Sequence, residues 1–169
     1  MAEDQRVEWF LLTDCPVDTE TQAREVFEWY TKRWGIEIFH RIIKSGCRSQ
    51  DRQLHTETRL ENCLAIDLVV AWRVFHLTML GRDCPKLPAS VCLDDPEWKM
   101  LCLKYTRKLP AKPPPLDQAV KWLGTLGGWI GNPRKAMPGP MTIWRGLITL
   151  LSMAEGWRLA CTLGMPAGP

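Results

Sequence analysis

Residues 30–44 read YTKRWGIEIFHRIIK, and four polar side chains in this stretch recur at helical spacing. Tyr30, Arg33, Glu37 and Lys44 lie at offsets of zero, three, seven and fourteen residues. At about 100° of rotation per residue, these offsets fall within an arc of roughly 60° on one side of a helix. A carboxylate beside a phenol, a guanidinium and an ammonium suits a site that handles a metal ion next to a phosphate group.

The alternative interpretation of this stripe is a solvated surface, because charged residues along one helix face usually point into water. The opposite arc of the same helix carries apolar side chains, namely Trp29, Ile36, Phe39 and Ile43. This pattern predicts a buried side and a polar stripe that faces away from it. Helical geometry by itself leaves both interpretations open.

The charge around the stripe is uneven. Between residues 31 and 52 there are six basic residues against two acidic ones, although the whole chain has a formal net charge of only +3. The basic residues are Lys32, Arg33, Arg41, Lys44, Arg48 and Arg52. A concentrated basic patch on a nearly neutral protein is typical of a surface that binds a nucleic-acid backbone, and a solvated basic face is the alternative.

The order and spacing of tyrosine, arginine, glutamate and lysine resemble the YREK signature of bacterial DDE transposases of the IS-four, or Tn-five-like, family. Further segments on both sides of the signature resemble the same proteins. These segments are VEWFLLTD at 7–14, KSGC at 44–47, VAWRV at 70–74, LGGWIG at 126–131 and WRGL at 144–147. The resemblance therefore extends from about residue 7 to about residue 158.

The resemblance implies that Glu37 is the third acid of a DDE triad. Three such carboxylates hold two divalent ions, normally Mg²⁺, for phosphodiester cleavage and strand transfer at transposon ends. Arg33 can bind a DNA phosphate bidentately, Lys44 supplies a mobile charge, and Tyr30 can donate its hydroxyl. In the family the first two aspartates lie upstream of the part represented here. We therefore expect an incomplete metal site and a chain that is inactive alone.

The segment Val7–Thr13 is predicted to be a strand that is apolar on both faces, which belongs inside a covered sheet. Asp14 and Asp18, which follow it, are interpreted as turn chemistry and a helix cap. The predicted fold class is mainly α with one orphan N-terminal strand. On the resemblance it is the C-terminal remnant of an RNase H-like α/β catalytic domain, followed by a helical C-terminal dimerisation module.

Four regions are predicted along the chain. Residues 1–82 form the catalytic remnant, 83–115 a Pro-rich linker with one short helix capped by Asp95, 116–161 the dimerisation module and 162–169 a disordered tail. In the remnant, Thr19 and Gln22 form a capping box that opens the signature helix, which bends at Gly35 and ends near residues 45–46. A second, largely buried helix is predicted over 58–80, with Asp67 and Arg73 as structural residues.

The last predicted helix, 142–161, has one apolar face at helical spacing. This face consists of Ile143, Leu147, Leu150, Leu151, Ala154, Trp157 and Cys161. Such a face on a terminal helix either closes the local core or pairs with another subunit. The transposase resemblance implies dimerisation through this region.

Several other kinds of function are disfavoured. Seven scattered cysteines without a Cys-x-x-Cys pair indicate reduced, mostly buried thiols. The glycines at 127, 128 and 131 lack the Gly-Lys-Ser/Thr of a nucleotide-binding loop. The chain has no uninterrupted apolar run of membrane-spanning length and no signal-like N-terminus, which predicts a cytoplasmic protein without a membrane partner.

Three hypotheses for the function remain. The first is the C-terminal fragment of a cut-and-paste transposase, which binds DNA and forms a homodimer or a heterodimer with the full transposase. The second is a noncatalytic protein that dimerises with the full-length transposase and inhibits it. The third is an unrelated helical DNA-binding module.

Overall fold

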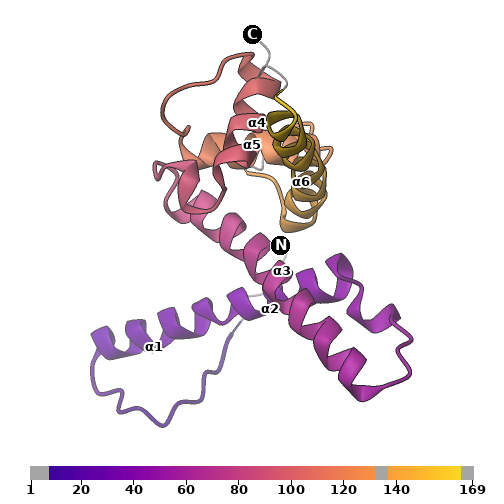
Figure 1. Cartoon of the computed structure of the whole chain (residues 1–169). Helices are drawn as coiled ribbons and strands as arrows, with labels where there is room; N and C mark the ends of the chain where they lie inside the picture. Colours follow the sequence, from indigo (N-terminus) through magenta and orange to yellow (C-terminus); the bar gives the residue numbers. More distant parts are fainter. Residues whose placement is uncertain (1–7, 132–136, 165–169) are drawn as a thin grey trace, which may run out of the picture. The chain divides into compact units, whose positions relative to one another are not determined.

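The computed structural model describes residues 8–131 and 137–164 of the 169-residue chain (Figure 1). The described residues form six α-helices: α1 (Glu20–Lys32), α2 (Trp34–Arg41), α3 (Glu57–Asp83), α4 (Asp95–Thr106), α5 (Leu116–Leu126) and α6 (Pro140–Thr162). Shorter helical turns are η1 (Ile42–Gly46), η2 (Ser49–Asp51) and η3 (Ala89–Val91). The chain divides into two compact units, Met1–Glu37 and Ile38–Pro169. The prediction of a mainly helical protein is confirmed.

The strand predicted over Val7–Thr13 is not formed in residues 8–13, which belong to no helix or strand; Val7 lies outside the described residues. Phe10 and Leu12 are 88% and 102% exposed. A strand requires a neighbouring strand to pair its backbone groups, and none of the described residues supplies one. The RNase H-like character of this region stays a prediction.

The helix α1 begins at the predicted capping box. The Thr19 hydroxyl accepts a hydrogen bond from the Gln22 backbone N–H, and the Gln22 side chain accepts one from the Thr19 N–H at 3.0 Å. Asp18, predicted as a cap, instead donates its own N–H to Gln22. No residue of α1 is buried, and Phe27 and Trp29 are 54% and 50% exposed.

The signature stretch is not one continuous α-helix. The chain makes a turn at Arg33, between α1 and α2, two residues before the poor helix former Gly35 at which a bend was predicted. After α2 the backbone continues as the π-helical turn η1, in which the Cys47 N–H donates to the Ile42 carbonyl at 3.1 Å. A π-helical turn rotates less per residue than an α-helix. The uniform rotation assumed as far as Lys44 is therefore wrong, although the predicted end at Gly46 is right.

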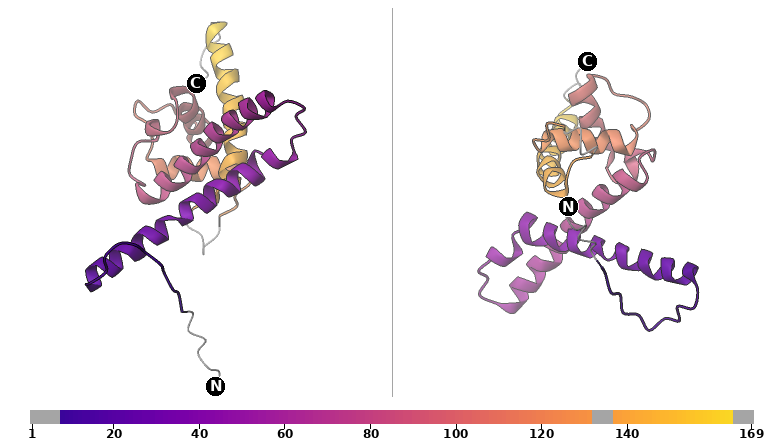
Figure 2. Two further views of the ribbon diagram at one scale, coloured as in Figure 1. Left: turned by 90° about the horizontal axis from the view of Figure 1, so that it is seen from below. Right: turned by 180° about the vertical axis from the view of Figure 1, so that it is seen from behind.

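The core of the second unit lies where α4, α5 and α6 gather against the C-terminal half of α3 (Figure 2). The fully or almost fully buried side chains there include Val74 and Leu77 of α3, Leu101 of α4, Leu116 and Leu123 of α5, and Ile143, Leu147 and Leu150 of α6. Each helix therefore contributes an apolar face to one shared interior.

The helices α5 and α6 approach closely because two glycines face backbone atoms. A Cβ atom on Gly146 would overlap the carbonyl oxygen of Leu123, and one on Gly127 would overlap the carbonyl oxygen of Thr142. Only a residue without a side chain permits this contact. Gly127 of the glycine-rich segment thus serves helix packing.

The helix α3 carries two ion pairs with buried carboxylates. Arg73 donates to both oxygens of Glu97 at 2.6 and 2.7 Å, and Arg52 lies 2.6 Å from Asp67. Glu97 is 1% exposed and Asp67 5% exposed. The interpretation of Asp67 and Arg73 as structural residues is confirmed.

The rest of α3 differs from its predicted burial. Ile66 and Val69 in its N-terminal half are 65% and 71% exposed, and Trp72 just past its middle is 56% exposed. The helix α3 is long and apolar enough to cross a membrane by length and composition alone. Core helices of soluble proteins also meet these two criteria. The C-terminal half of α3 contributes to the shared interior of the second unit.

The predicted linker 83–115 lies within the second compact unit. The Ala89 N–H donates to the Pro114 carbonyl at 2.8 Å, and Pro88 pairs with Pro115 in an isolated antiparallel bridge. The cap of α4 is Asp94, one residue before the predicted Asp95. The regions 1–82, 83–115 and 116–161 stay predictions as functional divisions. Of the predicted tail, Thr162 still belongs to α6, and residues 165–169 lie outside the described part.

All seven cysteines are free thiols, as predicted. The prediction that most are buried is wrong, because only Cys102 is fully buried and Cys15, Cys84 and Cys161 are exposed. Burial raises the pKa of the Cys102 thiol.

Candidate functional site

Three of the four predicted site residues contact one another in the first unit. The Arg33 guanidinium donates to the Glu37 carboxylate at 3.3 Å, and its central carbon lies 5.3 Å from the centroid of the Tyr30 ring. The Tyr30 ring also packs against the Trp9 ring in a T-shaped arrangement, with 6.0 Å between the ring centroids. The sequence spacing therefore does bring Tyr30, Arg33 and Glu37 together.

Both charged members of this group remain accessible. The side chains of Arg33 and Glu37 are 50% and 46% exposed. An exposed ion pair of this spacing on a helix contributes about 0.3–0.5 kcal/mol to stability. Arg33 can therefore exchange Glu37 for another anion, such as a phosphate, at little energetic cost.

Lys44, the fourth predicted site residue, lies in η1 of the second unit and is exposed. The neighbouring Ile42 is fully buried and anchors the turn. Since Lys44 and Glu37 belong to different compact units, the position of Lys44 beside the other three stays a prediction.

The six basic residues between positions 31 and 52 differ in whether they pair with an acid. Arg48 pairs with Asp51 at 2.7 Å, and Arg52 pairs with Asp67, so these two arginines have structural partners. Three others, Lys32, Arg41 and Lys44, make no ion pair with an acid among residues 8–131 and 137–164. These three have charge available to an external ligand, and so does Arg33, whose exposed pair with Glu37 is weak.

The Mg²⁺ ions implied by the family resemblance do not fit the described residues by themselves. Glu37 is the one carboxylate of the stripe, and its partner is Arg33. In the part of the chain that the structure describes, no three His, Cys, Asp or Glu side chains gather in a way that could hold a metal. A two-ion site needs several oxygen ligands around each ion. No metal-dependent step is therefore assigned to these residues alone.

The predicted apolar face of α6 turns out to close the local core. Its members Ile143, Leu147, Leu150 and Ala154 are buried, which favours the first of the two alternatives for this face. Leu151 and Cys161, which were assigned to the same face, are exposed.

A second apolar stripe on α6 was missed by the sequence prediction. Ile148, Leu151 and Leu159 are 50%, 41% and 57% exposed. Their offsets of zero, three and eleven residues place them within an arc of about 80° on one side of the helix. The signal for this stripe was that spacing, which the stronger core pattern beside it obscured.

The arrangement of α3 to α6 is thus a packed helical module with an additional exposed apolar stripe, as expected of an association domain. Residues 69–165 match the model of the family described as Transposase Tn5 dimerisation domain. This match covers more than half of the 169 residues, and the chain belongs to that family. The resemblance to Tn5-like transposases is confirmed for this region. The YREK spacing at 30–44 lies outside the match and stays a prediction.

Proposed function

We propose that this chain is the C-terminal part of a cut-and-paste DNA transposase. It dimerises through the exposed stripe of α6 and brings phosphate-binding side chains to transposon DNA in the cytoplasm. The observation that carries this proposal is the match of residues 69–165 to the dimerisation family. The partner is a second copy of the chain or the full-length transposase.

The α6 stripe suits a two-fold interface. Ile148, Leu151 and Leu159 are exposed, although the adjoining face of the same helix is packed into the core. A Cβ atom on Gly156, which flanks the stripe, would meet nothing within 4 Å. Pairing of α6 with its copy would cover the same stripe on both chains, as the symmetry of a dimer requires.

Sedimentation of the full chain tests this interface. We expect the wild-type chain to form a dimer, and Leu151→Asp and Leu159→Asp each to weaken it at least tenfold because a charge would be buried. The control is Val91→Asp, at a 49% exposed apolar residue of η3, which should leave the dimer intact. Equal behaviour of all three variants would refute the α6 interface.

The same proposal assigns Tyr30, Arg33 and Lys44 to the DNA backbone. The slope of the logarithm of DNA affinity against the logarithm of salt concentration should become shallower by roughly one for each lost phosphate contact. We expect this for Arg33→Ala and Lys44→Ala, whereas Lys112→Ala removes an exposed charge elsewhere and should have little effect. Unchanged slopes for Arg33→Ala and Lys44→Ala would count against the assignment.

Glu37 is proposed as the third acid of the complete enzyme. The complete enzyme also needs two aspartates, which in the family lie upstream of the part represented here. The full chain should therefore fail to nick DNA with Mg²⁺ present. Mg²⁺-dependent nicking that disappears in Glu37→Gln would show that the chain is active alone.

A noncatalytic role is the second candidate. It is favoured by the pairing of Glu37 with Arg33 and by a family match that covers the dimerisation domain. Such a chain would form heterodimers with the full transposase and inhibit it. Addition of the wild-type chain to an active transposase should then lower its activity, and Leu159→Asp should not. The family match argues against an unrelated DNA-binding module.

A further inference from the structure

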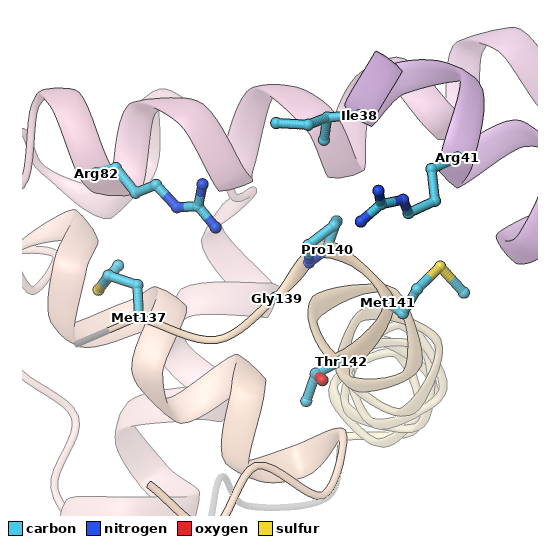
Figure 3. Close-up of a pocket in the computed structure, with 8 residues that line it drawn as sticks. All are labelled: Ile38, Arg41, Arg82, Met137, Gly139, Pro140, Met141 and Thr142. Atoms are coloured by element: carbon cyan, nitrogen blue, oxygen red, sulfur yellow. The ribbon is translucent and has the colours of Figure 1, made fainter. Parts of the chain in front are cut away.

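The second unit contains a cleft of about 690 Å³ between α2, α3 and α6 (Figure 3). Arg41 reaches it from the C-terminal end of α2, and Arg82 from the last turn of α3. Pro140 and Thr142, in the first turn of α6, line its floor. The three helices are far apart in the sequence, so the cleft exists only in the folded unit.

The side chains of Arg41 and Arg82 face this cleft, and no acidic side chain among the described residues pairs with them. Figure 3 shows the guanidinium groups of Arg41 and Arg82 directed into the same space from opposite sides. Neither arginine forms an ion pair with an acid in residues 8–131 or 137–164. No Asp or Glu occurs among the described residues that line the cleft. Like charges that share a cleft repel each other, and a bound anion would remove this repulsion.

The remaining surroundings also suit an anion. The amino end of the 23-residue helix α6 lies at the cleft, and a helix presents the positive end of its dipole there. Ile38 and Met137 add apolar contact area beside the two arginines. A guanidinium pair with apolar flanks matches the charged oxygens of a phosphate and the C–H groups of the sugar joined to it.

We propose that this cleft binds a phosphate group of a nucleic-acid strand, with Arg41 and Arg82 as its two main donors. The assignment to nucleic acid rests on the proposed function of the chain as part of a DNA-acting protein. It adds to that function a binding residue, Arg82, that belongs to the region matched by the dimerisation family. One domain would then both dimerise and hold the strand.

The test compares three arginine variants of the full chain. Arg41→Ala and Arg82→Ala should each reduce the salt slope of binding to a short DNA duplex by about 0.9, and should weaken binding roughly tenfold at about 0.1 M salt. Arg59→Ala is the matched control, because Arg59 is an exposed arginine near the other end of α3. It should change the affinity less than twofold. Equal effects of all three variants, or no effect of Arg41→Ala and Arg82→Ala, would overturn the proposal.

A second measurement separates the cleft from DNA binding as a whole. Inorganic pyrophosphate should raise the melting temperature of the wild-type chain and of Arg59→Ala, but not that of Arg82→Ala. In buffer alone Arg82→Ala should melt no lower than the wild type, since it removes a like charge. If the wild type binds pyrophosphate through Arg82 but binds no DNA, the proposed function fails and the phosphate site stands. If the wild type binds DNA and Arg82→Ala behaves as Arg59→Ala in both measurements, the cleft proposal alone fails.

Discussion

The two compact units differ in how their apolar side chains are used. In the first unit, α1 buries no residue, and large apolar side chains such as Phe10, Phe27 and Trp29 are at least half exposed. In the second unit, four helices share an interior whose central leucines, such as Leu77 and Leu123, are fully buried. The second unit therefore has a hydrophobic core of its own, as an independently stable domain requires.

This difference shows where stability and proposed chemistry reside. Isolated helices shorter than about 12–15 residues are marginal in water, and α1, with 13 residues, is near this limit. Tyr30, Arg33 and Glu37 thus lie on the unit with little packing of its own. On the proposed function, the exposed apolar side chains of this unit would pack against the sheet of a complete catalytic domain, and this packing stays a prediction.

The largest expected effect tests the close packing of the second unit. Gly146→Ala would place a Cβ atom into the Leu123 carbonyl oxygen, so α5 and α6 would have to separate. We expect a loss of about 3–5 kcal/mol in the free energy of unfolding, measured by urea denaturation.

Gly156→Ala provides the matched control on the same helix. A Cβ atom there would meet nothing within 4 Å, and alanine favours a helix over glycine. This variant should be more stable by about 0.5–1 kcal/mol. If Gly146→Ala were as stable as Gly156→Ala, α5 and α6 would not be in the close contact that the structure shows.

A smaller loss is expected from the buried ion pair of the second unit. Arg73→Ala leaves the Glu97 carboxylate 1% exposed and without its cation. We expect a loss of about 3 kcal/mol in the free energy of unfolding, because an uncompensated buried charge is costly. The counterpart in the first unit is Arg24→Ala, whose partner Glu20 is 80% exposed and which should cost less than about 0.5 kcal/mol. Comparable urea midpoints for the two variants would contradict the difference in burial.

Helices and their caps could be predicted from sequence because their signals are local. The capping box of Thr19 and Gln22 formed as predicted, and α4 begins within one residue of its predicted cap. The strand predicted at Val7–Thr13 depends on more than local sequence, because a strand needs neighbouring strands to pair its backbone hydrogen bonds. The predicted burial of α3 was wrong in its N-terminal half for the same reason. An apolar pattern predicts that a face is covered, but it does not show which residues would cover it.

The candidate site was predictable only in part. Tyr30, Arg33 and Glu37 meet because they lie within two helical turns, where spacing determines contact. The path to Lys44 crosses a π-helical turn, which no periodic pattern reveals. Arg82 could not be connected with Arg41 from sequence, because their shared cleft depends on how α2, α3 and α6 pack.

A third prediction concerns the local stability of the first unit. Thr19→Ala removes the hydroxyl that accepts the Gln22 N–H, and such a loss costs about 1 kcal/mol of helix stability. Without a core to hold α1, the amides of α1 should exchange with deuterium roughly fivefold faster. Thr21→Ala, at an exposed position inside the same helix, should not accelerate exchange. If the second unit also exchanged faster in Thr19→Ala, the two units would not be independent.

The smallest expected effect is at Leu12, in the segment predicted to be a strand. Leu12 is 102% exposed, so Leu12→Ala should change the free energy of unfolding by less than about 0.5 kcal/mol. The same substitution at the fully buried Leu123 should cost about 2–5 kcal/mol, because it leaves a cavity in the second unit. Urea denaturation of both variants at one protein concentration provides the comparison. A loss above about 1 kcal/mol in Leu12→Ala would mean that the first unit buries this segment in solution, and the contrast between the two units would then disappear.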